Sequence, residues 1–473
     1  MNLVPILPEI IILTAVCVVL VGDVFSRDRE HALAYWLAQI GLLSALTANT
    51  LTITRTTEML FNGMFIREPM AVVLKSFVLT TVIIVLVYSR DYLRQRRLMS
   101  GEYFMLALVA VLGMMVLISA GNLLLVYLGL ELLSLSLYSM VAMHRDSLAA
   151  SEAAMKYFVL GAIASGMLLY GMSMLYGITG SLDLAQISAG VAAMAGGKLL
   201  AVFALVFIVA GVAFKLGVVP FHMWIPDVYQ GAPTSVTLFI ATAPKIAAFA
   251  MAMRLFVHAL GPLAVDWQQM LIVLSIASMA IGNIVAISQT NLKRMLAYST
   301  IAHMGFLLLG ILSATPAGLS GAMFYAIVYA LMSMGAFGVI ILLGSADSES
   351  DQLEDFRGLS RRSPWFAMIM LILMFAMAGV PPFAGFWAKW FVLKEVVAAG
   401  HTWLAELAVG FSVIGAYYYL RIVRLMYFDS SEHNLPIVAS GDLRFALSIN
   451  GLAVLALGLM PGLLMGVCLV AMR

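Results

Sequence analysis

Four charged side chains lie inside apolar segments that are long enough to cross a lipid bilayer. Three are lysines, Lys215, Lys245 and Lys389, and the fourth is the carboxylate Glu131. A charged side chain at membrane depth costs about 2.5–3.5 kcal/mol on insertion scales, and such residues usually mark the path of an ion or a proton. The four residues therefore predict an ion or proton path through a membrane.

Two of these lysines stand beside an interruption of the apolar sequence. The segment 199–221 carries Lys215 and is broken by a glycine and a proline. A related interruption precedes Lys389, since residues 379–383 read GVPPF and residues 217–221 read GVVPF. A proline inside a helix removes a backbone hydrogen bond that protein or water must replace in lipid. Interrupted spans at corresponding places in two halves are typical of transporter repeats with an ion site between them.

Glu131 has a predicted partner. It lies in the middle of an uninterrupted apolar run, and Lys215 is expected at comparable depth. A buried carboxylate without a cation tends to neutralise, whereas a lysine keeps it charged. We therefore expect a Glu131–Lys215 pair, which either only ties two helices together or controls the charge on Lys215.

Four further residues have more than one interpretation. His222 follows the first interruption, where it either relays protons, because histidine titrates near neutral pH, or caps the broken helix. His303 is either a hydrogen-bonded core residue or a proton relay. Lys156 and Lys75 stand near the ends of their helices, and such lysines usually extend to the membrane interface. For Lys156, a place in the proton path is the alternative.

The composition excludes several classes of protein. The chain of 473 residues is 63% hydrophobic and 11% charged, far from the usual composition of soluble domains. Its net charge of +2 implies no nucleic-acid partner. The two cysteines are far apart, and the sequence shows no metal-ligand spacing and no nucleotide-binding motif. We expect no metal and no redox cofactor in this chain.

Apolar segments of roughly 20 residues predict an all-α polytopic membrane protein with about fourteen transmembrane helices. The first is interpreted as a helix and not as a signal peptide, because it has no basic start. The expected spans are 3–23, 32–54, 69–89, 103–120, 122–143, 153–178, 199–221, 234–257, 267–289, 293–314, 318–344, 364–396, 402–428 and 445–470. The seventh and twelfth are expected to be discontinuous. Four regions follow from this pattern: 1–102, a first five-helix repeat at 103–260, an inverted second repeat at 261–430, and 431–473.

The basic residues in the loops predict the orientation. Lysine and arginine gather on the cytoplasmic side of membrane proteins. Sixteen basic residues fall in one set of alternate loops and six in the other, which places both termini in the periplasm. The sixteen are Arg27, Arg29, Arg90, Arg94, Arg96, Arg97, Arg145, Lys156, Lys293, Arg294, Arg357, Arg361, Arg362, Arg421, Arg424 and Arg444, and the six are Arg55, Arg67, Lys198, Arg254, Lys394 and Arg473.

Two stretches have simple interpretations at this point. The charged segment 345–362 is expected to be a solvated connector without a functional motif. The three tyrosines at 417–419 stand at the inner end of their helix and are interpreted as part of an interfacial aromatic belt.

Several motifs together resemble those of the antiporter-like membrane subunits of respiratory complex I, the NADH:quinone oxidoreductase. They are residues 129–132 (GLEL), the stretch 220–233 with Lys215 and Lys245 around it, and residues 385–389 (GFWAK). Residues 226–233 (PDVYQGAP) and 288–294 (SQTNLKR) are most similar to the subunit N branch of this family. The resemblance covers essentially the whole chain.

The resemblance implies a fold, site residues and partners. It implies fourteen helices with two inverted five-helix repeats, and a proton path through Glu131, Lys215, Lys245 and Lys389 with His303 on the same polar axis. It also implies that other subunits bind NADH, FMN, iron–sulfur clusters and quinone. The neighbours in the bacterial inner membrane would be the antiporter-like subunit M and the small subunit K.

The expected function is proton translocation coupled to electron transfer from NADH to quinone in partner subunits. Movement of Glu131 relative to Lys215 would switch that lysine between holding and releasing a proton, which passes to Lys245 and Lys389. Two alternatives stay open. One is a subunit of a multisubunit cation/proton antiporter, and the other is a membrane scaffold that pumps nothing.

Overall fold

The structure is a computed structural model that describes residues 3–26, 28, 30–54, 56–194, 198–345, 348–430 and 439–472. Four basic residues of the orientation argument lie outside the described residues: Arg27, Arg29, Arg55 and Arg473. The described chain is helical almost throughout, with one short two-stranded hairpin. The elements in chain order are η1 (Val4–Ile6), α1 (Leu7–Phe25), α2 (Ala32–Leu51), β1 (Glu58–Leu60), β2 (Phe65–Arg67), α3 (Pro69–Gln95), α4 (Gly101–Ile118), α5 (Leu123–Val141), α6 (Leu148–Thr179), α7 (Leu184–Ala192), α8 (Leu199–Leu216), α9 (Trp224–Gly231), α10 (Thr234–Ala241), α11 (Ala243–Ala252), η2 (Met253–Ala259), η3 (Gly261–Leu263), α12 (Ala264–Ile287), α13 (Leu292–Leu312), α14 (Pro316–Leu343), η4 (Leu353–Phe356), α15 (Leu359–Arg362), α16 (Pro364–Ala378), α17 (Ala384–Ala398), α18 (Thr402–Tyr427), α19 (Gly441–Leu459) and α20 (Pro461–Ala471).

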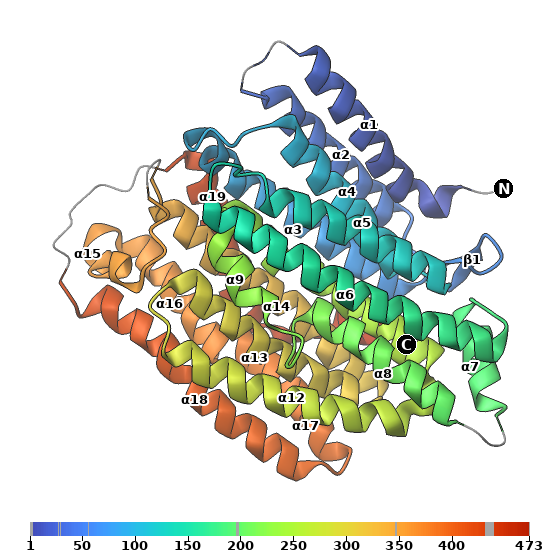
Figure 1. Ribbon diagram of the computed structural model, residues 1–473. Helices are drawn as coiled ribbons and strands as arrows, with labels where there is room; N and C mark the ends of the chain where they lie inside the picture. Colours follow the sequence, from blue (N-terminus) through green and yellow to red (C-terminus); the bar gives the residue numbers. More distant parts are fainter. Residues whose placement is uncertain are drawn as a thin grey trace.

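The helices form one bundle of membrane-crossing segments. Among the described residues, twelve helical runs are long and apolar enough to cross a membrane. The helix α2 and the broken pair α16–α17 occupy the two remaining positions at which the sequence predicts spans. Figure 1 shows the helices side by side, with α1 and α2 at one edge and α18 at the opposite edge. The prediction of an all-α polytopic membrane protein is confirmed.

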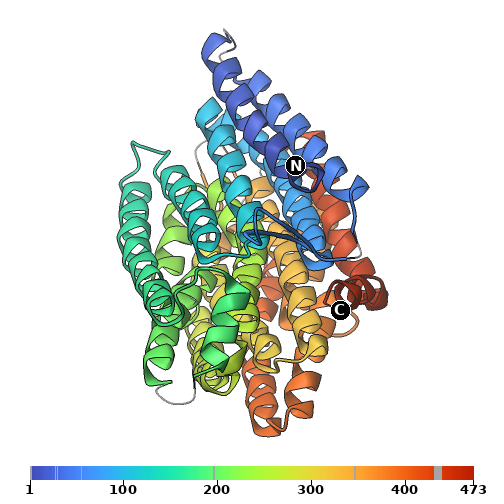
Figure 2. The ribbon, with the colours of Figure 1, turned by 90° about the vertical axis from the view of Figure 1, so that its right-hand side faces the viewer.

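The two faces of the bundle differ in their loops. On one face, the β1–β2 hairpin pairs with the turn between α4 and α5, and that turn pairs with Asp183 before α7. Figure 2 looks toward this face and shows both ends of the chain on it. The opposite face, which we call the arginine-rich face, carries the ends of α3 and α5, the starts of α4 and α13, and the connector between α14 and α16. There Arg96 donates to the backbone oxygens of Ser345 and Ser348 at 2.7 and 2.6 Å.

Glycine brings the same pair of helices together in each half of the chain. A Cβ at Gly113 in α4 would lie 2.6 Å from the Leu133 nitrogen and 2.8 Å from the Gly129 oxygen in α5. A Cβ at Gly282 in α12 would lie 2.6 Å from the Ala302 nitrogen and 2.8 Å from the oxygen one turn earlier in α13. Such distances leave no room for a side chain, so each pair packs backbone against backbone. The close contact thus recurs between the fourth and fifth and between the ninth and tenth predicted spans.

Four of the predicted spans are interrupted within the described residues, and one of them, the fourteenth, divides into α19 and α20 at Met460, just before Pro461. The predicted seventh span divides into α8 and α9, and the twelfth into α16 and α17, as expected from their glycines and prolines. The eighth span is also broken, because Thr242 has φ −116° and ψ −98° and separates α10 from α11. The sequence carried a signal for this third break in Pro244, which lacks a backbone N–H and stands in the first turn of α11, where a proline is tolerated.

Candidate functional site

The first interruption leaves a helix end inside the bundle, and a lysine occupies it. The helix α8 stops at Leu216 because Gly217 adopts φ +83°, a left-handed conformation that suits glycine. The last carbonyls of a helix have no partner within that helix. The ammonium of Lys245, on α11, donates to the Leu216 oxygen at 2.9 Å. It also lies 5.2 Å from the centre of the Trp224 ring and is buried.

The second interruption repeats this arrangement with different residues. The helix α16 stops at Ala378, where Gly379 adopts φ +86°. The ammonium of Lys389, on α17, donates to the Ala378 oxygen at 2.9 Å and to the Ser412 hydroxyl at 2.7 Å. Each broken helix therefore presents carbonyl oxygens to one buried lysine.

These sites hold the lysines without a fixed counter-ion. Among the described residues, no ion pair involves Lys215, Lys245 or Lys389. Burial disfavours a charged amine, while the negative end of a helix dipole and its free carbonyls favour it. The balance between the two effects is sensitive to any neighbouring charge that moves. This is the arrangement needed for a group that takes up and releases a proton.

Glu131 and Lys215 lie on the same side of the bundle but do not form the expected direct pair. Lys215 donates to the Ser134 hydroxyl at 3.0 Å, and Glu131 accepts a hydrogen bond from Ser165 on α6. Ser134 is three residues after Glu131 on α5, hence one turn closer to the end of α8. The prediction of a direct ion pair is wrong for this conformation, because a serine on the neighbouring turn occupies the ammonium.

His303 joins the second lysine site. Its Nδ1 lies 2.7 Å from the Tyr325 hydroxyl and its Nε2 lies 3.0 Å from the Tyr419 hydroxyl. One small cavity is lined by both His303 and Lys389, together with Tyr418 and Tyr419. The interpretation of residues 417–419 as an interfacial belt is wrong for the last two tyrosines, which are buried. Only Tyr417 is exposed. Two further tyrosines lie around His303, Tyr325 and Tyr329, and neither carried a signal in the sequence.

The remaining predicted residues lie away from the two lysine sites. Lys156 is part-exposed and pairs with Glu152 and Asp227, both at 2.8 Å. The interface position, one of its two interpretations, stays a prediction. The side chain of His222 is half-buried, and its Nδ1 has no hydrogen-bond partner among the described residues.

Lys75 contradicts its predicted interface position. It is only 2% exposed and pairs with Glu9 of α1 at 2.5 Å. The neighbouring helix α1 covers the lysine and supplies a carboxylate, so the side chain does not extend to the membrane surface.

Comparisons with known proteins agree with this architecture. A sequence profile of the family described as "NADH:quinone oxidoreductase/Mrp antiporter, TM" matches residues 120–415. A relative from Thiobacillus denitrificans, NADH-quinone oxidoreductase subunit N, is 56% identical over 471 residues, covering 100% of this chain and 98% of the relative. The chain belongs to the family of NADH-quinone oxidoreductase subunit N.

Solved structures extend this result to the fold. A chain of respiratory complex I from Thermus thermophilus is 33% identical, with a TM-score of 0.83 and coverage of 97% of this chain and 98% of that one. A chain of the Mrp complex from a Dietzia species is 20% identical, with a TM-score of 0.86 and coverage of 100% and 97%. The second likeness shows a shared fold alone.

Membership of the subunit N family confirms the expected function class. The chain is a multi-pass membrane subunit of the proton-translocating NADH:quinone oxidoreductase and works beside other membrane subunits of that complex. Among the described residues, no cluster of histidine, cysteine and carboxylate side chains could hold a metal ion.

Proposed function

We propose that protons cross this subunit by way of Lys215, Lys245 and Lys389, with His303 as a relay to the last of these and Glu131 adjusting the charge on Lys215. The supporting observation is the repeated geometry, in which Lys245 and Lys389 each donate to the free carbonyl end of a broken helix. His222 and Lys156 fall outside this route, since neither contacts it.

The interaction between two nearby charges is large enough to drive a proton against the membrane potential. Moving one charge against 100 mV costs about 2.3 kcal/mol. Two unit charges about 4 Å apart interact by about 4 kcal/mol at an effective dielectric constant near 20. A shift of a few ångströms in Glu131, or in a charge of a neighbouring subunit, therefore suffices to move a proton between lysines. The energy would come from quinone reduction elsewhere in the complex.

We also propose an orientation in the membrane, an internal repeat and the partner subunits. The arginine-rich face would meet the cytoplasm of a bacterium and both termini the periplasm, because basic residues gather on that face. Residues 103–260 and 261–430 would be two inverted repeats between the flanking regions 1–102 and 431–473. NADH, FMN, iron–sulfur clusters and quinone would be held by other subunits, and the membrane neighbours would be subunits M and K.

Substitution of a lysine by methionine tests the route, since it removes the charge and keeps most of the volume. We expect Lys389→Met and Lys245→Met to leave the complex assembled but to abolish NADH-driven proton uptake in inverted membrane vesicles. Lys394→Met is the matched control, because this lysine lies on the same helix with a side chain that is 66% exposed. Normal pumping in Lys389→Met or Lys245→Met, with assembly intact, would show that the charges only hold the helices.

A further inference from the structure

The connector between α14 and α16 carries a carboxylate into the bundle. Glu349 accepts hydrogen bonds from the Tyr92 hydroxyl at 2.5 Å and from the Thr234 hydroxyl. It pairs with Arg96 at 3.2 Å and lies 3.9 Å from the ammonium of Lys293. The expectation of a solvated connector is wrong at this residue, because three helical side chains and Arg96, directly after α3, hold it.

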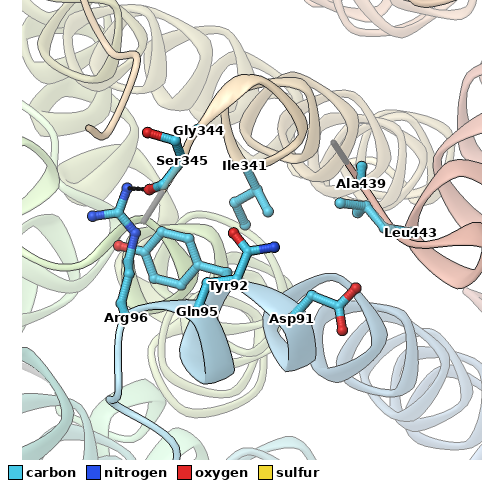
Figure 3. Close-up of a pocket in the computed structure, with 9 residues that line it drawn as sticks. All are labelled: Asp91, Tyr92, Gln95, Arg96, Ile341, Gly344, Ser345, Ala439 and Leu443. Carbon is cyan, nitrogen blue, oxygen red and sulfur yellow. Dashed lines mark hydrogen bonds between the residues drawn. The ribbon is translucent and has the colours of Figure 1, made fainter. Parts of the chain in front are cut away.

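Glu349 also remains in contact with solvent. Its side chain is 29% exposed, whereas that of Lys293 is only 2% exposed. Tyr92 and Arg96, which hold Glu349, line a pocket that reaches the arginine-rich face beside Ser345 (Figure 3). The carboxylate thus stands where the aqueous side meets the buried lysine, and Thr234 contacts both.

A line of hydroxyl groups continues inward along α13. Thr300 lies two turns after Lys293, which is about 10 Å along the helix. The Tyr329 hydroxyl donates to Thr300 at 2.6 Å, and the ring of Tyr329 lies 5.3 Å from that of His303. Since His303 shares a cavity with Lys389, these groups join Thr300 to the second lysine site.

One buried group in this line is poorly hydrogen-bonded. Among the described residues, the hydroxyl of Tyr229 is buried and has no hydrogen bond of normal geometry, although the Thr300 hydroxyl lies close enough to interact with it. A buried polar group without a partner is costly, and an ordered water is a usual explanation.

We propose that Glu349, Thr234 and Lys293 form a proton intake on the arginine-rich face, from which protons pass by way of Tyr229, Thr300 and Tyr329 to His303. Glu349 takes a proton from water and gives it to the buried groups, and the next proton restores it. No bond other than those to the moving proton changes. This inference rests on the proposed function, because it supplies the protons that Lys389 would carry.

Two substitutions test the intake in the complete complex. Glu349→Gln keeps the shape of the side chain but cannot carry a proton, and Tyr229→Phe removes only the buried hydroxyl. In a purely structural role the second change would be neutral or stabilising, because the lost group makes no hydrogen bond of normal geometry. The matched controls are Glu354→Gln, on the same connector with a side chain 63% exposed, and Tyr88→Phe, another buried tyrosine whose hydroxyl has no hydrogen bond of normal geometry among the described residues.

The readout is NADH-driven proton uptake and electron transfer in inverted vesicles over a pH range. A positioned group contributes about 100-fold or more to the rate of a proton-transfer step. Both variants should therefore show slower proton uptake and electron transfer than the wild type as the pH rises from about 6 to about 8, because the supply of protons from water falls. The groups facing Glu349 are Tyr92 of α3, Arg96 directly after α3, Thr234 of α10 and Lys293 of α13. None of these is changed in either variant.

The outcomes separate this inference from the proposed function. Wild-type pumping in Tyr229→Phe at every pH, or a loss in Glu349→Gln that does not depend on pH, overturns the intake. If Glu349→Gln fails to assemble, Tyr229→Phe alone decides by the same criterion. If Tyr229→Phe pumps like the wild type while Lys389→Met does not pump, only the intake is refuted. Normal pumping in Lys389→Met refutes the proposed function as well.

Discussion

The buried pair between Lys75 and Glu9 makes a sharp prediction about stability. The two side chains are 3% and 9% exposed, and their charged atoms lie 2.5 Å apart. Removing one partner of a buried pair typically costs about 3–5 kcal/mol, because the other charge stays buried without compensation. We expect Lys75→Met to lower the free energy of unfolding by this amount. The ammonium also lies 4.7 Å from the centre of the Phe65 ring, a contact that is lost at the same time.

The double substitution isolates the pair. Glu9→Met alone should cost a similar amount, since it leaves the lysine buried. Glu9→Met with Lys75→Met should fall within about 1 kcal/mol of the native protein, because replacing a buried pair by apolar residues of similar volume is often neutral. The measurement is reversible unfolding of the purified subunit in mixed detergent micelles, with the amount of assembled complex in membranes as a second readout.

Two results would refute this reasoning. A cost below about 1 kcal/mol for Lys75→Met would place the lysine at the membrane interface, where exposed ion pairs contribute little. Single costs that simply add in the double variant would show that the two charges do not interact.

Two other predictions follow from the helix break and the connector. Gly379→Ala should lower stability by about 1–2 kcal/mol and also reduce proton pumping, because a Cβ there would lie 2.9 Å from Cδ of Lys389. Gly400 also has φ +86°, but a Cβ there would meet no other atom, so Gly400→Ala should lower stability and leave proton pumping unchanged. Equal pumping in the two variants would contradict the argument. Burial raises the pKa of Glu349, but Lys293 and the other groups that hold the carboxylate outweigh this effect and keep its pKa below the usual value. The ionised carboxylate therefore stabilises the fold fully when the pH is above the usual pKa of a glutamate, and this stabilisation is lost as the pH falls through the lowered pKa. In thermal unfolding, the advantage of the native protein over Glu349→Gln should stay constant near neutral pH and shrink in acid, and an advantage that grows in acid would refute this account.

The positions of the spans and of two breaks follow from local properties of the chain. Hydropathy and the effects of proline depend on neighbouring residues, so α8 with α9 and α16 with α17 appear where the sequence predicts interrupted helices. The cost of a charge in lipid is likewise a property of a single residue. For this reason Lys215, Lys245 and Lys389 stand out in the sequence before any packing is known.

The partners of the charged residues come from the tertiary structure alone. Lys75 meets Glu9, and Glu349 meets Tyr92 from 257 residues away. Within a membrane bundle, helix faces toward lipid and toward protein are both apolar, so periodicity no longer separates them. Which face turns inward depends on close contacts such as that of Gly113 with α5. The sequence thus determined which residues carry the charge, and packing decided what each charge meets.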